Sequence, residues 1–141
     1  MKLEQQVASL ELSRKLKELG VEQESAFYWW WDFNYKNEPC NIDLRNHGPI
    51  LGKNENRACA AFTVAELGEL LPEKISTGFD SLQIHKNGSW EVMYGLYGTT
   101  FEAEEFKPTH AEEDENLANA LAKMLVYLIE QGILPKVEGE V

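Results

Sequence analysis

The sequence is poor in the residues and patterns that mark several large classes of protein. It has only two cysteines among 141 residues, and no apolar run approaches the length of about 18 residues that spans a membrane. The first six residues lack the apolar core of a secretion signal. We therefore expect no membrane association and a cytoplasmic location, where Cys40 and Cys59 are two free thiols. A disulfide between them is the alternative.

Basic residues are scarce, because 13 Lys and Arg stand against 24 Asp and Glu, for a net charge of −11. Residues 1–62 hold nine acids and eight bases, whereas residues 96–141 hold ten acids and three bases. Phosphate recognition depends on clustered Lys and Arg, and no such cluster occurs. The composition thus excludes direct nucleic-acid binding, while 43% apolar residues are enough for a folded core.

Patterns typical of catalytic and metal sites are also missing. No nucleophile motif, glycine-rich phosphate loop or kinase-type signature occurs. The histidines at positions 47, 85 and 110 are scattered, and none has a second ligand at the spacing of a metal site. We therefore expect no cofactor, no bound metal and no enzymatic activity.

Aromatic residues, by contrast, are concentrated in one place. Seven of the fifteen lie within residues 27–35, a run that favours an extended strand. Side chains alternate along a strand, so Trp29 and Trp31 lie on the larger apolar face, which we expect to form the core. Truncating Trp29 should then cost more stability than truncating Trp30. The opposite face, expected to be partly covered, is the candidate partner surface and consists of Tyr28, Trp30 and Asp32.

Capping residues and periodic leucines predict three helices. The first covers residues 10–19, with Ser9 as its N-cap and Gly20 as its stop. The second covers residues 64–71, and the longest covers 110–131 with a broad apolar face. The last two begin at capping-box pairs, namely Thr63 with Glu66 and Thr109 with Glu112.

A meander of three strands is predicted over residues 81–106, and its first turn contains Gly88. A three-residue loop with a left-handed Gly88 aligns Ile84 with Trp90, which buries more apolar surface than a two-residue turn does. The third strand is predicted at residues 99–106. The meander therefore supplies an antiparallel surface that a helix can cover.

The whole chain, residues 1–141, is expected to form one α+β domain. A small, mostly antiparallel sheet would hold the aromatic strand and the meander, covered by the long C-terminal helix and two shorter helices. Residues 34–61 contain six Asn, two Pro and two Gly, which predicts a mobile polar loop. Order is expected to end after residue 135.

Four consecutive acids near the start of the last predicted helix form a candidate acidic surface, which consists of Glu112, Glu113, Asp114 and Glu115. One interpretation is a surface that imitates the phosphates of DNA. The other is an ordinary helix start, because negative charge in the first turns favours the helix dipole.

Three stretches of the chain carry a resemblance, namely Ser9–Gly20 leading through Glu24 and Ser25 into Phe27-Tyr28-Trp29, then Phe62–Pro72, then Ala122–Glu130. Together they resemble small uncharacterised proteins of phages and prophage-bearing bacteria. The resemblance implies no catalytic or binding residues. The loop at 34–61 departs from the shorter members of that group.

These observations predict a small acidic accessory protein of phage type that is not an enzyme and that binds an unknown protein partner. A homodimer is the variant in which the partner is a second copy. Two other functions stay open. One is an acidic mimic of nucleic acid that inhibits a DNA-binding enzyme, and the other is a small-molecule or carbohydrate binder that uses the tryptophan cluster.

Overall fold

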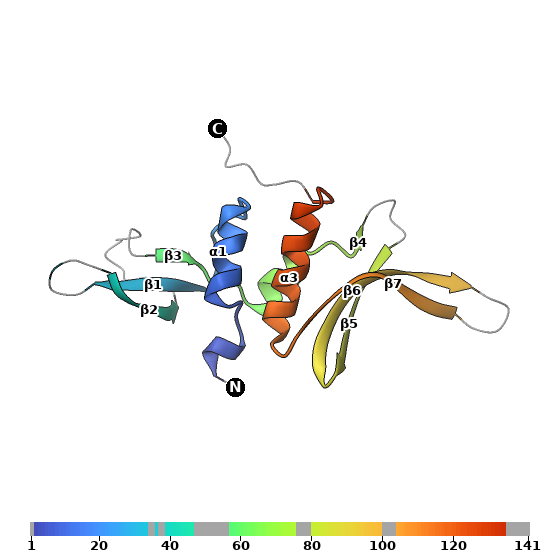
Figure 1. Cartoon of the computed structure of the whole chain (residues 1–141), viewed down its shortest axis with the longest axis horizontal. Helices are drawn as coiled ribbons and strands as arrows, with labels where there is room; N and C mark the ends of the chain where they lie inside the picture. Colours follow the sequence, from blue (N-terminus) through green and yellow to red (C-terminus); the bar gives the residue numbers. More distant parts are fainter. Residues whose placement is uncertain are drawn as a thin grey trace.

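The chain folds into a mixed α+β structure with two small antiparallel sheets on either side of a group of helices (Figure 1). The computed structural model describes residues 2–33, 36, 39–46, 57–75, 80–99 and 104–134. Its elements in chain order are the 3-10 helix η1 (Leu3–Gln5), α1 (Leu10–Glu18), β1 (Phe27–Phe33), β2 (Pro39–Asn46), β3 (Arg57–Ala60), α2 (Val64–Leu70), β4 (Lys74–Ile75), β5 (Asp80–Asn87), β6 (Ser89–Thr99), β7 (Glu104–Asp114) and α3 (Leu117–Glu130). The predicted α+β class and its long C-terminal helix are confirmed.

The strands form two sheets, where the sequence predicts one. The first sheet has the order β2-β1-β3 and the second has β4-β5-β6-β7, and Figure 1 shows them extending from the helices in opposite directions. Residues 39–46 and 57–60 form β2 and β3, so the prediction of a loop is wrong there. The reason is that β1 needs a hydrogen-bonding neighbour along each edge, and these strands supply both. The predicted frayed tail after residue 135 lies outside the described residues.

The first helix begins and ends as its capping residues predict. Ser9 Oγ accepts a hydrogen bond from Leu12 N at 3.3 Å, and Gly20 has a φ of 87°. Val21 N donates to Leu16 O at 3.1 Å, which closes the C-terminal turn. Local sequence therefore determines both ends of α1.

The capping box of α2 is confirmed as well. Thr63 Oγ1 accepts from Glu66 N at 3.2 Å, and Glu66 Oε1 accepts from Thr63 N at 2.9 Å. The helix ends at Leu70, and Leu71 is already extended. Pro72 explains this end, because the residue before a proline is driven out of the helical region.

The hairpin of β5 and β6 has a register two residues away from the predicted one. Ile84 pairs with Val92, whereas the prediction pairs it with Trp90. Gly88, at the tip, has a φ of +80° and is left-handed as predicted. A shift of two residues keeps every side chain on its predicted face. It also places Val92 and Tyr94, both fully buried, where they join the core.

The boundary between the last strand and the last helix differs from the prediction. The third strand of the meander begins at residue 104 rather than 99, and residues 110–114 continue it beside β6. Thr109 and Glu112 therefore lie on a strand and do not cap a helix. The long backbone ladder with β6 satisfies amides that a helix start would leave without partners.

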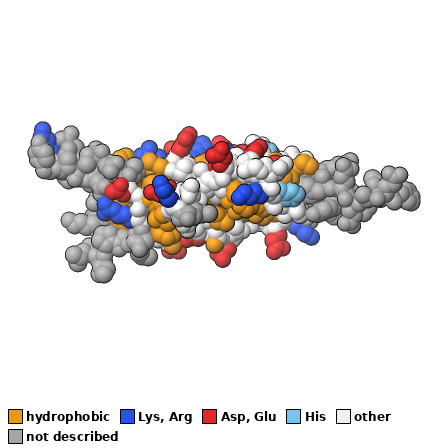
Figure 2. Space-filling view, turned by 90° about the horizontal axis from the view of Figure 1, so that it is seen from below, with side chains coloured by type: hydrophobic (Ala, Val, Ile, Leu, Met, Phe, Trp, Pro, Cys, Tyr) orange, Lys and Arg blue, Asp and Glu red, His pale blue; other side chains and the backbone are white. Residues whose placement is uncertain are grey.

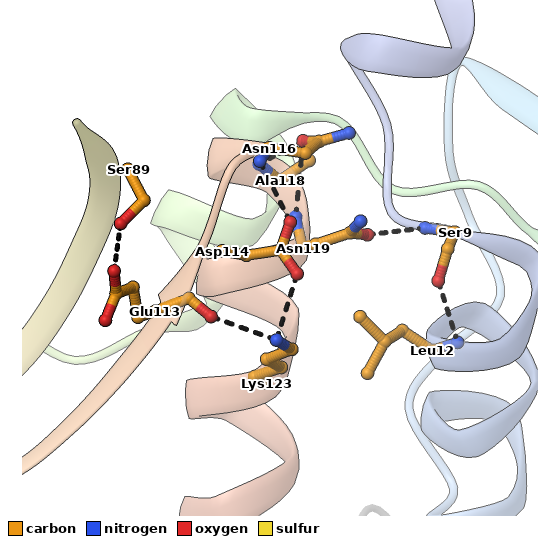
Figure 3. A network of polar contacts seen from close by, with 9 residues as sticks. All are labelled: Ser9, Leu12, Ser89, Glu113, Asp114, Asn116, Ala118, Asn119 and Lys123. Atoms are coloured by element: carbon orange, nitrogen blue, oxygen red, sulfur yellow. Dashed lines mark hydrogen bonds and ion pairs between the residues drawn. The ribbon is translucent and has the colours of Figure 1, made fainter. Parts of the chain in front are cut away.

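Asn116 begins α3 instead. Its Oδ1 accepts from Ala118 N at 2.8 Å, while its Nδ2 donates to Glu4 O at 3.3 Å. Nearby, Asn119 Oδ1 accepts from Ser9 N at 2.7 Å, as Figure 3 shows. These two asparagines therefore join the start of α3 to the N-terminal segment and to the start of α1.

A hydrophobic core joins both sheets to the helices, with α3 in the middle. Leu121, Met124 and Leu128 on α3 are at most 1% exposed. The same core contains Trp30 from β1 and Tyr94 from β6. Helix α3 contacts α1, α2, β6 and β7. Both sheets thus depend on one shared core.

Candidate functional site

The two faces of β1 are buried in the opposite sense to the prediction. Tyr28 is 5% exposed and Trp30 is 2% exposed, and both belong to the core. Buried side chains offer no contact surface, so the expected exposure of this face is wrong. Asp32, the third residue of the candidate partner surface, has a side chain outside the described residues.

Tyr28 and Trp30 are buried because this face meets the helices and because the polar group of Tyr28 finds partners there. The Tyr28 hydroxyl donates to Gln23 O at 3.3 Å and accepts from Ser25 N at 3.2 Å. The two rings pack edge to face, with centroids 6.5 Å apart at 74°. Leu16 of α1 lies in the same core. The number of aromatic residues on a face did not decide which face is buried.

The other face of β1 forms the surface that we call the tryptophan face. Its members are Phe27, Trp29 and Trp31 of β1 with Leu44 of β2, which pairs with Trp29. Each of the four is partly exposed, and none belongs to the core. Trp29 Nε1 is buried without a hydrogen-bond acceptor among the described residues. The result is a largely apolar sheet face that the rest of the described chain covers incompletely.

Two cations of α1 flank the tryptophan face, and sequence reasoning missed both. The guanidinium carbon of Arg14 lies 5.3 Å from the centroid of the Trp31 ring. Lys17 Nζ donates to Ala58 O of β3 at 2.8 Å. Arg14 and Lys17 are exposed. Their spacing along the helix indicates a shared face, but no local signal connects that face to Trp31.

Cys59 lies at the edge of this region as a free, buried thiol. Burial raises its pKa to about 11, although the charges of Lys17 and Arg14 act in the opposite direction. The thiol is therefore neutral near pH 7. Cys40 is on β2, and Cys59 is on β3 on the other side of β1, so the Cα atoms of the two cysteines are separated by at least roughly 10 Å, the width of two strand spacings. A disulfide bridges Cα atoms no more than about 7 Å apart, so the predicted free thiol is confirmed for Cys59.

The candidate acidic surface lies on β7 and the turn after it, not in the first turns of a helix. Asp114 binds Lys123 Nζ at 2.9 Å, and Lys123 also donates to Glu113 O at 2.9 Å, as Figure 3 shows. Glu113 accepts from Ser89 Oγ, and Glu112 contacts His110 Nε2. Three of the four acids thus have partners within the chain. An open, shallow hollow lies beside these acids. It is lined by Gly88, Ser89, Glu113, Asp114 and Glu115.

Among these acids, Asp114 has the most partners within the chain. Burial raises the pKa of its carboxyl, but hydrogen bonds from Asn116 N and Lys123 outweigh burial and lower the pKa below its ordinary value. This carboxylate holds the turn between β7 and α3 in place. Its role is explained by the fold without a ligand.

The two described histidines, His85 and His110, lie on different strands, β5 and β7. His110 stacks on Tyr127 of α3, with ring centroids 3.4 Å apart and an interplanar angle of 3°. His85 is exposed opposite Glu91, and His47 lies outside the described residues. Within the described ranges, no three His, Cys, Asp or Glu side chains are placed to hold a metal ion. The stacking of His110 on Tyr127 could not be read from the sequence, because it joins a strand to a helix.

Figure 2 shows apolar side chains at the surface of the middle of the molecule, among acidic and basic ones. In the part of the chain that the structure describes, no helix is long and apolar enough to cross a membrane. Comparisons with family models, with curated proteins and with solved structures found no match to this chain.

Proposed function

We propose that this protein is a non-enzymatic accessory protein, of the phage type that its sequence resembles, and that it acts by binding another protein through the tryptophan face. The observation that carries the proposal is the partial exposure of Phe27, Trp29, Trp31 and Leu44 on one sheet face. Large contiguous apolar patches are uncommon at the surface of soluble monomers, and such patches mark interaction sites.

The chemistry of this face supports a protein partner. Trp and Arg are the residues most enriched among those that dominate binding energy at protein interfaces. Here the guanidinium carbon of Arg14 already lies 5.3 Å from the centroid of the Trp31 ring. A tryptophan side chain has only two rotatable bonds, so little free energy is lost when a partner orders the indole rings.

The acidic surface supports its alternative function less well. A mimic of nucleic acid needs carboxylates that are available to a basic partner. Glu112 and Asp114 are engaged by His110 and Lys123 of the same chain. A sugar or another small molecule would use the same indole rings as a protein partner, and the absence of any cross-linked protein in the experiment below would favour that function.

The test compares matched leucine variants. The tagged chain is expressed in its native host, bound proteins are cross-linked and identified, and the binding of each is repeated with purified components. Leu44→Ala, on the tryptophan face, should weaken that binding. Leu70→Ala removes a leucine of α2 that is 40% exposed and should leave it unchanged. Equal binding by both variants, or loss with Leu70→Ala alone, would show that the partner uses another surface.

A further inference from the structure

We propose that the protein segment recognised by the tryptophan face carries Asp or Glu side chains beside its apolar residues, and that Arg14 and Lys17 bind those carboxylates. This inference rests on the proposed function and specifies the kind of partner. It is an interaction between an apolar, acidic segment and a sheet face that is flanked by cations.

Arg14 is placed to bind a carboxylate at the tryptophan face. Its guanidinium lies over the Trp31 ring at 5.3 Å, and the side chain is exposed. The attraction of a guanidinium to an aromatic ring leaves its N–H donors unused, and these donors can bind both oxygens of one carboxylate. The contact with Trp31 also places the positive charge of Arg14 at the tryptophan face.

Lys17 is the second cation beside the tryptophan face. Its ammonium donates to Ala58 O at 2.8 Å, and an ammonium has three donors in all. Among the described residues, no carboxylate forms an ion pair with Arg14 or Lys17. The Cys59 thiol beside them is neutral and adds no negative charge. The cationic charge on this side of the face is therefore available to an incoming acid.

The overall charge of the chain favours the opposite kind of partner. A net charge of −11 attracts basic partners over long range, and salt screens that attraction. Contacts at the tryptophan face favour an acidic partner instead. The local and the global electrostatics thus predict opposite preferences, and an experiment can separate them.

The experiment uses three short synthetic peptides in which leucine alternates with glutamate, with glutamine or with lysine. Binding is followed by the indole N–H resonances of the full-length protein, which has four tryptophans. We expect the leucine–glutamate peptide to shift the Trp29 and Trp31 resonances but not that of Trp90. Arg14→Gln should weaken this binding on the order of tenfold. Arg14→Lys, which keeps the charge but loses the planar fork, should weaken it less. Lys74→Gln removes an exposed cation of β4 and should have no effect.

Each result has one meaning. Equal binding of the glutamate and glutamine peptides at Trp31 would leave the contact surface in place and overturn the selection of acids. Tightest binding of the lysine peptide would overturn it too, in favour of the overall charge. If no peptide shifts Trp29 or Trp31, or if Lys74→Gln weakens binding as much as Arg14→Gln, the proposed partner chemistry is wrong. The leucine variants with the native partner then decide the proposed function separately.

Discussion

Three consecutive tryptophans show how neighbouring residues of one strand meet different surroundings. Trp30 is 2% exposed in the core, whereas Trp29 and Trp31 are only partly covered. Alternation along β1 explains the difference, because adjacent side chains point to opposite faces. The face that meets α1 and the core is the one with fewer aromatic residues.

Replacing Trp30 by alanine should lower the free energy of unfolding by about 3–5 kcal/mol, because it leaves a cavity in a packed core. Trp31→Ala should lower it by only about 1 kcal/mol, mainly through the lost contact with Arg14. Urea unfolding followed by circular dichroism measures both values. Similar losses for the two variants would mean that the tryptophan face is also core, and the proposed contact surface would be wrong.

Glu66 shows how one carboxylate can join the segment before β1 to the start of α2. Its Oε1 accepts from Ser25 Oγ at 2.7 Å and from Thr63 N at 2.9 Å, and its Oε2 accepts from Ala26 N at 2.9 Å. Burial raises the pKa of this carboxyl, but the hydrogen bonds outweigh burial. The pKa therefore lies below its ordinary value of 4.5.

A carboxyl whose pKa is lower in the folded state stabilises the fold above its unfolded pKa, and this contribution is lost as pH falls through the folded pKa. Glu66→Gln should therefore lower the free energy of unfolding at neutral pH by about 1 kcal/mol. The difference from the wild type should shrink below pH 4.5. Urea unfolding over a series of pH values measures it. Glu69→Gln, exposed on the same helix, is the control, and a difference that does not vary with pH would contradict the role of the carboxylate.

At the scale of elements, single turn and cap residues decide where strands and helices begin and end. Gly88 has a φ of +80° at the tip of the β5–β6 hairpin, whereas Gly68 lies within α2. No atom lies within 4 Å of a Cβ built at either glycine. The two sites therefore differ in backbone conformation and not in available space.

Gly88→Ala should lower the free energy of unfolding by about 1 kcal/mol, because a left-handed backbone strains an L side chain. Gly68→Ala should raise it by up to about 1 kcal/mol, because alanine favours a helix. Thermal unfolding of the two variants gives the opposite signs directly. The same sign at both positions would show that backbone conformation does not control these sites.

A second pair of variants tests the start of α3. Asn116→Ala should lower the free energy of unfolding by about 1–2 kcal/mol, because it removes the N-cap and the hydrogen bond to Glu4 O. Thr109→Ala should have an effect within about 0.5 kcal/mol, since Thr109 is an exposed strand residue. Urea unfolding measures both. A larger loss for Thr109→Ala would restore the helix start that the sequence predicts.

At the scale of the whole molecule, the shared core should make the two sheets unfold together. It contains Trp30 from the first sheet and Val92 from the second, and Leu128 of α3 is fully buried within it. Urea titrations followed by the indole resonances of Trp30 and Trp90 should give one midpoint. Leu128→Ala should lower the urea midpoint to the same value at both resonances. The free energy of unfolding should fall by about 2–5 kcal/mol. Two separate midpoints would mean that the sheets fold independently.

The sequence by itself determined the features that depend on residues a few positions apart. The caps at Ser9, Gly20 and the Thr63–Glu66 pair were predicted correctly, because their hydrogen bonds close within one or two turns of the chain. The α+β class followed from the same local periodicities. The position of the aromatic strand at β1 was also predictable, since aromatic residues favour extended backbone.

Only the tertiary structure decided which strands pair with β1, which of its faces is buried and which cations flank the tryptophan face. Local pattern also placed the start of the last helix at Thr109, although pairing with β6 holds that segment in a strand. Arg14 and Trp31 belong to a helix and a strand, so no short-range pattern connects them. Burial depends on which surfaces of distant segments meet, because apolar contacts have no direction and no fixed spacing along the chain.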